Sequence, residues 1–147
     1  MRSRILTVDD SKTVQLIVRR AFRPFDCDVY EAPNGAVGIE LALLARPDVI
    51  LLDVIMPVMD GERTLIELRS SPDLRHVPVI MLATSESMSV WLKVHETGIR
   101  DFIAKPFGCD AVVRKVARFL ALRPLAGSGG AGIFPVRGSK APWRGQG

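Results

Sequence analysis

Five polar side chains stand at the ends of short apolar runs of the sequence: Asp9, Asp10, Asp53, Thr84 and Lys105. Three carboxylates brought close together repel one another, so such a group either raises a pKa or recruits a cation. A site with only oxygen ligands suits Mg²⁺, which binds a few carboxylates together with waters and phosphate oxygens. An ammonium and a hydroxyl can bind the oxygens of a transferred phosphoryl group. If the five side chains meet, they describe a carboxylate nucleophile that accepts a phosphoryl group with the help of a metal.

The elements that must bring these residues together are short strands alternating with helices. The central run, 49–53, is apolar without alternation until Asp53, which is typical of a strand buried on both faces of a parallel sheet. Further strands are predicted at 5–8, at 28–32, within 77–83 and at 102–104. Helices are predicted at 11–23, 35–46, 62–70 and 88–97, and a last helix is marked by the apolar positions of 112–120. Five strands alternating with five helices predict a doubly wound parallel sheet. In such a sheet, ligands bind beyond the carboxyl ends of the strands, where all five polar residues fall.

The motifs that follow the predicted strands, taken in order, resemble the receiver domain of two-component response regulators over about residues 3–122. The matching stretches are Val-Asp-Asp-Ser at 8–11, Ala-Pro-Asn-Gly at 32–35, Asp-Val-Ile-Met-Pro-Val-Met-Asp-Gly at 53–61, Ala-Thr-Ser at 83–85 and Phe-Ile-Ala-Lys-Pro-Phe at 102–107. The resemblance implies a flavodoxin-like fold, a five-stranded parallel sheet in the order 2-1-3-4-5 with five helices.

The resemblance also implies roles for the acidic residues. Asp53 is expected to be the phosphorylated aspartate. Asp10 and Asp53 are expected to bind Mg²⁺ directly, Asp9 through water, and Ile55 through its backbone carbonyl. Asp9 and Asp10 alone would more often cap a helix, and Asp53 alone would more often be a turn residue, so their combination carries the prediction.

The remaining site residues are assigned by the same resemblance. Lys105 is expected to pair with the phosphoryl oxygens, and the Lys105–Pro106 peptide bond is expected to be cis. Thr84 should hydrogen-bond a phosphoryl oxygen and move on activation, although a threonine there could also simply cap a helix. Phe102 occupies the aromatic switch position and, without a hydroxyl, would act through packing alone. The interval from Thr84 to Lys105 is about one residue shorter than the family pattern.

These residues predict a stand-alone receiver that takes a phosphoryl group from a histidine kinase or a phosphotransfer protein. It would catalyse its own phosphorylation and dephosphorylation and signal to an unknown protein partner. An aspartyl-phosphate hydrolase is the alternative enzyme, but such enzymes place a second acid where this chain has Ile55. A receiver-like interaction module that is never phosphorylated is a third possibility. A flavin-binding domain is a fourth, but this chain has no obvious hydroxyl-bearing loop after its first strand to bind a phosphate.

Composition limits the other possibilities. With 147 residues and 48% hydrophobic residues, the chain should form one domain at 1–122. That part carries sixteen basic and sixteen acidic residues, so the net charge of +4 belongs to the Gly/Pro-rich segment 123–147, which is predicted to be a disordered tail. The charge therefore gives no reason to expect nucleic-acid binding.

The sequence predicts a cytoplasmic protein with free thiols, because its two cysteines are widely spaced, it has no apolar run long enough to span a bilayer and it shows no signal peptide. Trp91 could be a core residue or an exposed anchor for a partner.

Overall fold

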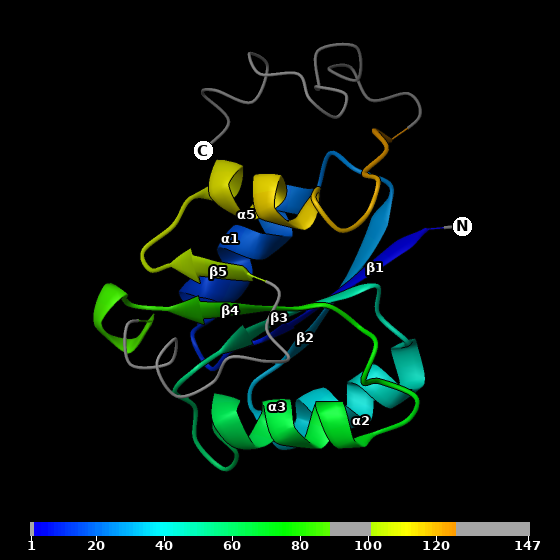
Figure 1. Ribbon diagram of the computed structural model, residues 1–147. Helices are drawn as coiled ribbons and strands as arrows, with labels where there is room; N and C mark the ends of the chain where they lie inside the picture. The colour runs from blue at the N-terminus through cyan, green and yellow to red at the C-terminus, as the bar shows by residue number, and fades with distance from the viewer. Residues whose placement is uncertain (1, 89–100, 126–147) are drawn as a thin grey trace.

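The sheet has five parallel strands, as expected. The computed structural model describes residues 2–88 and 101–125, and the strands that it contains are β1 (Ser3–Val8), β2 (Cys27–Ala32), β3 (Val49–Asp53), β4 (Val79–Ala83) and β5 (Asp101–Ala104). The strands lie in the order β2-β1-β3-β4-β5 and every neighbouring pair is parallel (Figure 1). The predicted flavodoxin-like topology is confirmed.

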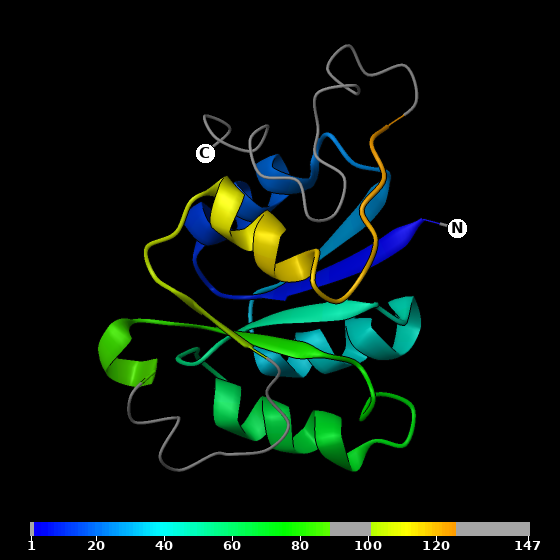
Figure 2. The ribbon, with the colours of Figure 1, turned by 45° about the horizontal axis from the view of Figure 1, so that its top comes forward.

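Helices cover both faces of the sheet. The helices α1 (Lys12–Phe22) and α5 (Cys109–Val116) lie on one face, and α2 (Gly35–Ala45) and α3 (Gly61–Ser70) lie on the other (Figures 1 and 2). Right-handed crossovers between parallel strands produce this two-sided arrangement. Within the described residues, no helix is long and apolar enough to cross a membrane.

The central strands are apolar without alternation because both of their faces are covered. Along β3, Ile50 and Leu52 join the core under α2 and α3, whereas Val49 and Leu51 join the core under α1 and α5. All four side chains are fully buried. Burying a side chain of this size contributes roughly 1.5–3 kcal/mol, so the central strand is fixed in the sheet and its last residue, Asp53, is fixed with it.

Side chains at the loop ends determine where three of the helices begin. Ser11, Asn34 and Asp60 accept hydrogen bonds from the backbone N–H groups of Val14, Val37 and Arg63, respectively. Such a cap satisfies an otherwise unpaired donor and contributes about 1 kcal/mol. Ser11 is therefore the N-cap of α1.

The last helix is shorter than predicted. Regular α-helix ends at Val116, because the N–H groups of Arg118 and Phe119 bond to carbonyls three residues back and tighten the final turn. Phe119 and Leu120 still pack against the core. The helix predicted at 88–97, including Trp91, falls almost wholly outside the described residues, although 85–88 are helical.

The chain continues beyond the predicted domain boundary with a short pairing. The Asp26 N–H donates to the Arg123 carbonyl, the Leu125 N–H donates to the Pro24 carbonyl, and Phe25 and Pro124 form an antiparallel bridge. The first three residues of the predicted tail are therefore attached to the loop between α1 and β2. The rest of that segment lies outside the described residues. Cys27 and Cys109 are free thiols, and burial raises the pKa of Cys27 to about 11.

Candidate functional site

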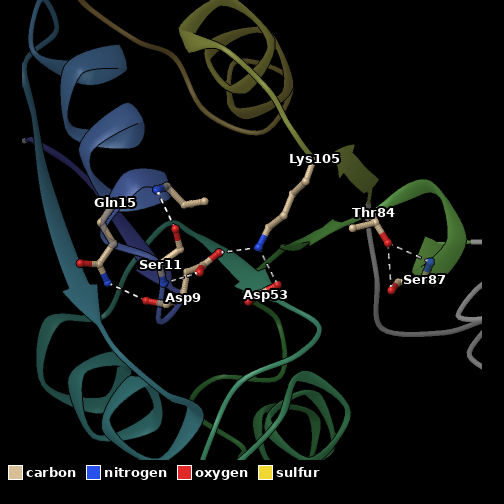
Figure 3. A network of polar contacts seen from close by, with 8 residues as sticks. Asp9, Ser11, Gln15, Asp53, Thr84, Ser87 and Lys105 are labelled. Carbon is tan, nitrogen blue, oxygen red and sulfur yellow. Dashed lines mark hydrogen bonds and ion pairs between the residues drawn. The ribbon is translucent and has the colours of Figure 1, made fainter.

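Four of the predicted site residues meet at the carboxyl ends of the strands. Asp9 and Asp10 follow β1, Asp53 is the last residue of β3, and Lys105 follows β5. Because β1 and β3 are neighbours although they are not consecutive in the sequence, the sheet reverses its winding between them. This is the point at which doubly wound sheets leave a crevice for ligands. Figure 3 shows the Lys105 side chain reaching across this edge towards Asp9 and Asp53.

Lys105 joins the acidic residues by direct contacts. Its Nζ donates a hydrogen bond to Oδ1 of Asp53 at 2.9 Å and lies 3.1 Å from Oδ2 of Asp9. The Lys105 side chain is 22% exposed, whereas those of Asp9 and Asp53 are 0% and 8% exposed. One ammonium thus faces two nearly buried carboxylates, with Asp10 beside them, so the site keeps an excess of negative charge.

Three carboxylates are close enough to hold one metal ion. Asp9, Asp10 and Asp53 each offer an oxygen, and these oxygens lie within 4.8 Å of one another. Oδ2 of Asp9 is buried and has no hydrogen-bond partner, although Lys105 lies nearby as an ion pair. A buried carboxylate oxygen without such a partner, in a group made only of oxygen ligands, fits a hard cation such as Mg²⁺.

Neighbouring residues hold Asp9 in place. Its Oδ1 accepts the Ser11 N–H at 2.8 Å, and its own N–H donates to the Ala32 carbonyl at 3.0 Å. The Nε2 atom of Gln15 donates to the carbonyl of Asp9 at 2.8 Å (Figure 3). It also donates to the carbonyl of Ala32 at 3.3 Å. The sequence did not single out Gln15. Its position one turn after the Ser11 cap, on the first turns of α1, was the signal that could have found it.

The loop from β3 to α3 is packed closely behind Asp53. The Gly61 N–H donates to the Val54 carbonyl at 2.8 Å, and a Cβ at Gly61 would lie 2.4 Å from the Asp53 carbonyl oxygen. Only glycine allows the backbone to approach so closely. Within the same loop Val58 has a φ of 68°, and the Met59 N–H donates to the Pro57 carbonyl across it at 2.7 Å. This is a γ-turn in the strained left-handed region, where a β-branched residue is an outlier.

Ile55 lies two residues after Asp53, at the start of the same loop. The Ile55 N–H group hydrogen-bonds the Asp53 carboxylate, and the Ile55 side chain is 70% exposed. The backbone of Ile55 therefore already contacts the site.

Thr84 lies at the same edge of the sheet, but its hydroxyl contacts Ser87 and not the acidic residues. Its Oγ1 accepts the Ser87 N–H at 3.2 Å and lies 3.1 Å from Oγ of Ser87, so it caps the helical residues 85–88 (Figure 3). The residue is exposed. Phe102, on β5, is half-buried and packs against the core beneath α2 and α3. The predicted cis peptide bond between Lys105 and Pro106 is confirmed.

Burial and neighbouring charge shift the pKa values of the central pair. Burial raises the pKa of Asp53 and the charge of Asp9 adds to this, whereas the hydrogen bond from Lys105 partly opposes it. Burial alone would lower the pKa of Lys105, but the contacts with Asp53 and Asp9 outweigh burial and raise it. Because the folded state binds the Asp53 proton more tightly than the unfolded state, Asp53 favours folding at low pH. That contribution is lost as the pH rises from 3.8 through the raised pKa.

Comparison with known proteins identifies the family. Residues 5–117 match the family model described as the response regulator receiver domain. The chain is 32% identical over 121 residues to the protein PilH of Pseudomonas aeruginosa, which covers 81% of this chain and 98% of PilH. The chain belongs to the response regulator receiver family. It is therefore a receiver domain of the kind used in two-component signalling.

Some relatives carry this receiver domain as a small part of a longer protein. The sensor histidine kinase TmoS of Ectopseudomonas mendocina is 28% identical over 120 residues, and the chain spans only 12% of its length. The chain spans 15% of the sensor histidine kinase CheAY of Helicobacter pylori.

Solved structures agree with the topology. The chemotaxis response regulator CheY4 of Vibrio cholerae superposes with a TM-score of 0.75 at 28% identity, covering 82% of this chain and all of CheY4. The receiver domain of the sensor histidine kinase PA1611 from Pseudomonas aeruginosa has a TM-score of 0.71 at 28% identity, covering 81% of this chain and 98% of that one. That structure is described with a magnesium ion coordinated in its active-site cleft.

Proposed function

We propose that this receiver domain accepts a phosphoryl group on the Asp53 carboxylate. The observation that carries the proposal is the contact of Lys105 with both Asp53 and Asp9 inside a group of three carboxylates. In the transfer, an oxygen of Asp53 forms a bond to phosphorus while the bond from phosphorus to the donor breaks, and the donor keeps the electron pair. Asp53 must be ionised to attack, and the hydrogen bonds from Lys105 and from the Ile55 N–H favour the ionised form.

The chain's own residues supply the positioning. Asp10 and Asp53 would bind Mg²⁺ directly, with Asp9 acting through water and Ile55 through its carbonyl, and the ion would neutralise charge on the phosphoryl oxygens. The three grouped carboxylates and the magnesium described for the PA1611 receiver support this assignment. Lys105 would remain with the phosphoryl oxygens and keep its proton.

The signal would leave the site through Thr84 and Phe102. Thr84 would turn its hydroxyl towards a phosphoryl oxygen, and Phe102 would repack beside it and change the protein-binding surface. The donor would be a histidine kinase or a phosphotransfer protein of the cytoplasm. The similar regions within the sensor histidine kinases TmoS and CheAY support this class of donor.

We also propose that the receiver domain occupies 1–122 and that 123–147 are a basic tail, whose first three residues pair with the loop between α1 and β2. The family match over 5–117 supports this boundary.

Phosphorylation is tested with acetyl phosphate and Mg²⁺, and the product is measured by intact mass spectrometry. The wild-type chain should gain one phosphoryl group, and chelation of Mg²⁺ should prevent this. Asp53→Asn should gain none. Asp60→Asn is the matched control, since Asp60 is exposed, lies in the same loop and only caps α3, a role that asparagine keeps. An equal mass gain in Asp53→Asn would overturn the assignment, and steady turnover of a phosphate ester would favour a hydrolase instead.

A further inference from the structure

The helix α2 is apolar apart from one residue although it lies on the surface. Among its eleven residues, Gly-Ala-Val-Gly-Ile-Glu-Leu-Ala-Leu-Leu-Ala, the only charged one is Glu40. Gly35, Gly38 and Ala42 face the core. A surface helix normally carries polar residues on its outer side, and a helix without them is normally covered by another structure.

The outer side of α2 presents two leucines to solvent. Leu44 is 83% exposed and Leu43 is 41% exposed. On the neighbouring helix α3, which runs beside α2, Ile66 is 54% exposed (Figure 1). Single exposed leucines are common, but two in sequence on a helix with one charge mark an interaction surface.

The charges beside the leucines identify the occupant. Glu40 precedes Leu43 by three residues, and Arg46, the residue that ends the helix, follows Leu43 by three. When two copies of α2 pack antiparallel about a two-fold axis at Leu43, Glu40 of each copy faces Arg46 of the other. A parallel pairing would instead place like charges together. The surface is thus complementary to itself, as a two-fold interface requires.

The charges around this surface are compatible with such pairing. Within residues 2–88 and 101–125, the side chain of Arg46 makes a long ion pair with Asp73 at 3.6 Å, and both side chains are more than half exposed. An exposed pair of this kind contributes little and is readily exchanged. Glu40 is also exposed.

We propose that this chain forms a two-fold homodimer through α2, with Leu43 and Leu44 at its centre and Glu40–Arg46 ion pairs between the copies. The interface lies outside the candidate phosphorylation site, so the proposal stands independently of the proposed function. It applies to the unphosphorylated protein.

The test is sedimentation velocity of the full unphosphorylated chain over a range of concentrations. We expect a monomer–dimer equilibrium that Leu44→Ser weakens strongly without altering the fold, because that side chain is mostly exposed. Glu40→Arg and Arg46→Glu should each weaken association about tenfold, since each turns two attractive pairs into repulsive ones. The matched control is Arg20→Glu, because Arg20 is an exposed residue of α1, on the opposite face of the sheet from α2. It should leave association unchanged.

Mixing the two charge variants gives the sharpest result. Glu40→Arg alone has two arginines at this surface and Arg46→Glu alone has two glutamates, so each should pair with itself about tenfold more weakly than the wild type does. An equimolar mixture should form heterodimers as strongly as the wild type. A wild-type chain that stays monomeric at high concentration, or a mixture that does not associate, would overturn the proposal.

Discussion

Replacing Val58 with glycine should stabilise the protein, which is unusual for the loss of a side chain. The left-handed conformation costs an L-residue roughly 1–2 kcal/mol, and branching at Cβ places valine at the upper end. Glycine removes this strain but adds about 0.4–1 kcal/mol of entropy to the unfolded chain. The Val58 side chain is 84% exposed, so its removal loses little burial. The free energy of unfolding should therefore rise by about 1 kcal/mol, and Tm by about 3–5 °C.

Thermal and urea unfolding of the purified variant would measure this gain. Ile55→Gly is the matched control, because Ile55 is 70% exposed in the same loop and does not have a positive φ. It should lower the free energy of unfolding by about 0.5–1 kcal/mol, since only the entropy of the unfolded chain changes. If Val58→Gly destabilises the protein as much as Ile55→Gly does, the strain assigned to this turn is wrong.

Three further outcomes are expected. Asp53→Asn should raise the free energy of unfolding at pH 7, where burial of the ionised carboxylate opposes folding, and urea titrations should show the gain shrinking as the pH falls towards 3.8. Gly35→Ala should lower the free energy of unfolding by about 1–3 kcal/mol, because its Cβ would lie 1.8 Å from Oγ1 of Thr64. Adding Thr64→Ala should recover part of that free energy, and equal stability of the single and the double variant would contradict this contact. A chain truncated after residue 122 lacks the two backbone hydrogen bonds of 123–125 and should be about 1–3 kcal/mol less stable than a chain truncated after residue 125. Equal melting curves for the two truncated chains would refute the pairing.

The sheet and the acidic site could be predicted because each depends on a repeated local pattern. Strands buried on both faces show unbroken apolar runs, and a parallel sheet brings the ends of those runs to one edge. Asp9, Asp53 and Lys105 therefore meet although they are far apart in the sequence.

The remaining features depend on contacts that no local pattern encodes. Gln15 bonds to the carbonyls of Asp9, just after β1, and of Ala32, the last residue of β2, and its position one turn after the Ser11 cap does not by itself reveal either bond. The left-handed turn at Val58 lies in the loop that ends with Gly61 packed against β3, and it opposes the preference of valine itself. The early end of α5 comes from a tightening of its last turn, which its apolar spacing does not reveal.

The hydroxyl of Thr84 has a consequence for how a signal could leave this edge. The same oxygen that would reach towards an occupied Asp53 now accepts the N–H that begins the turn at 85–88. One hydroxyl oxygen cannot contact the acidic pocket and cap this turn at the same time. Any rotation that brings this oxygen to the acidic pocket must therefore break its hydrogen bond with the Ser87 N–H. Phosphorylation of Asp53 would then remove the cap from the helical turn at 85–88.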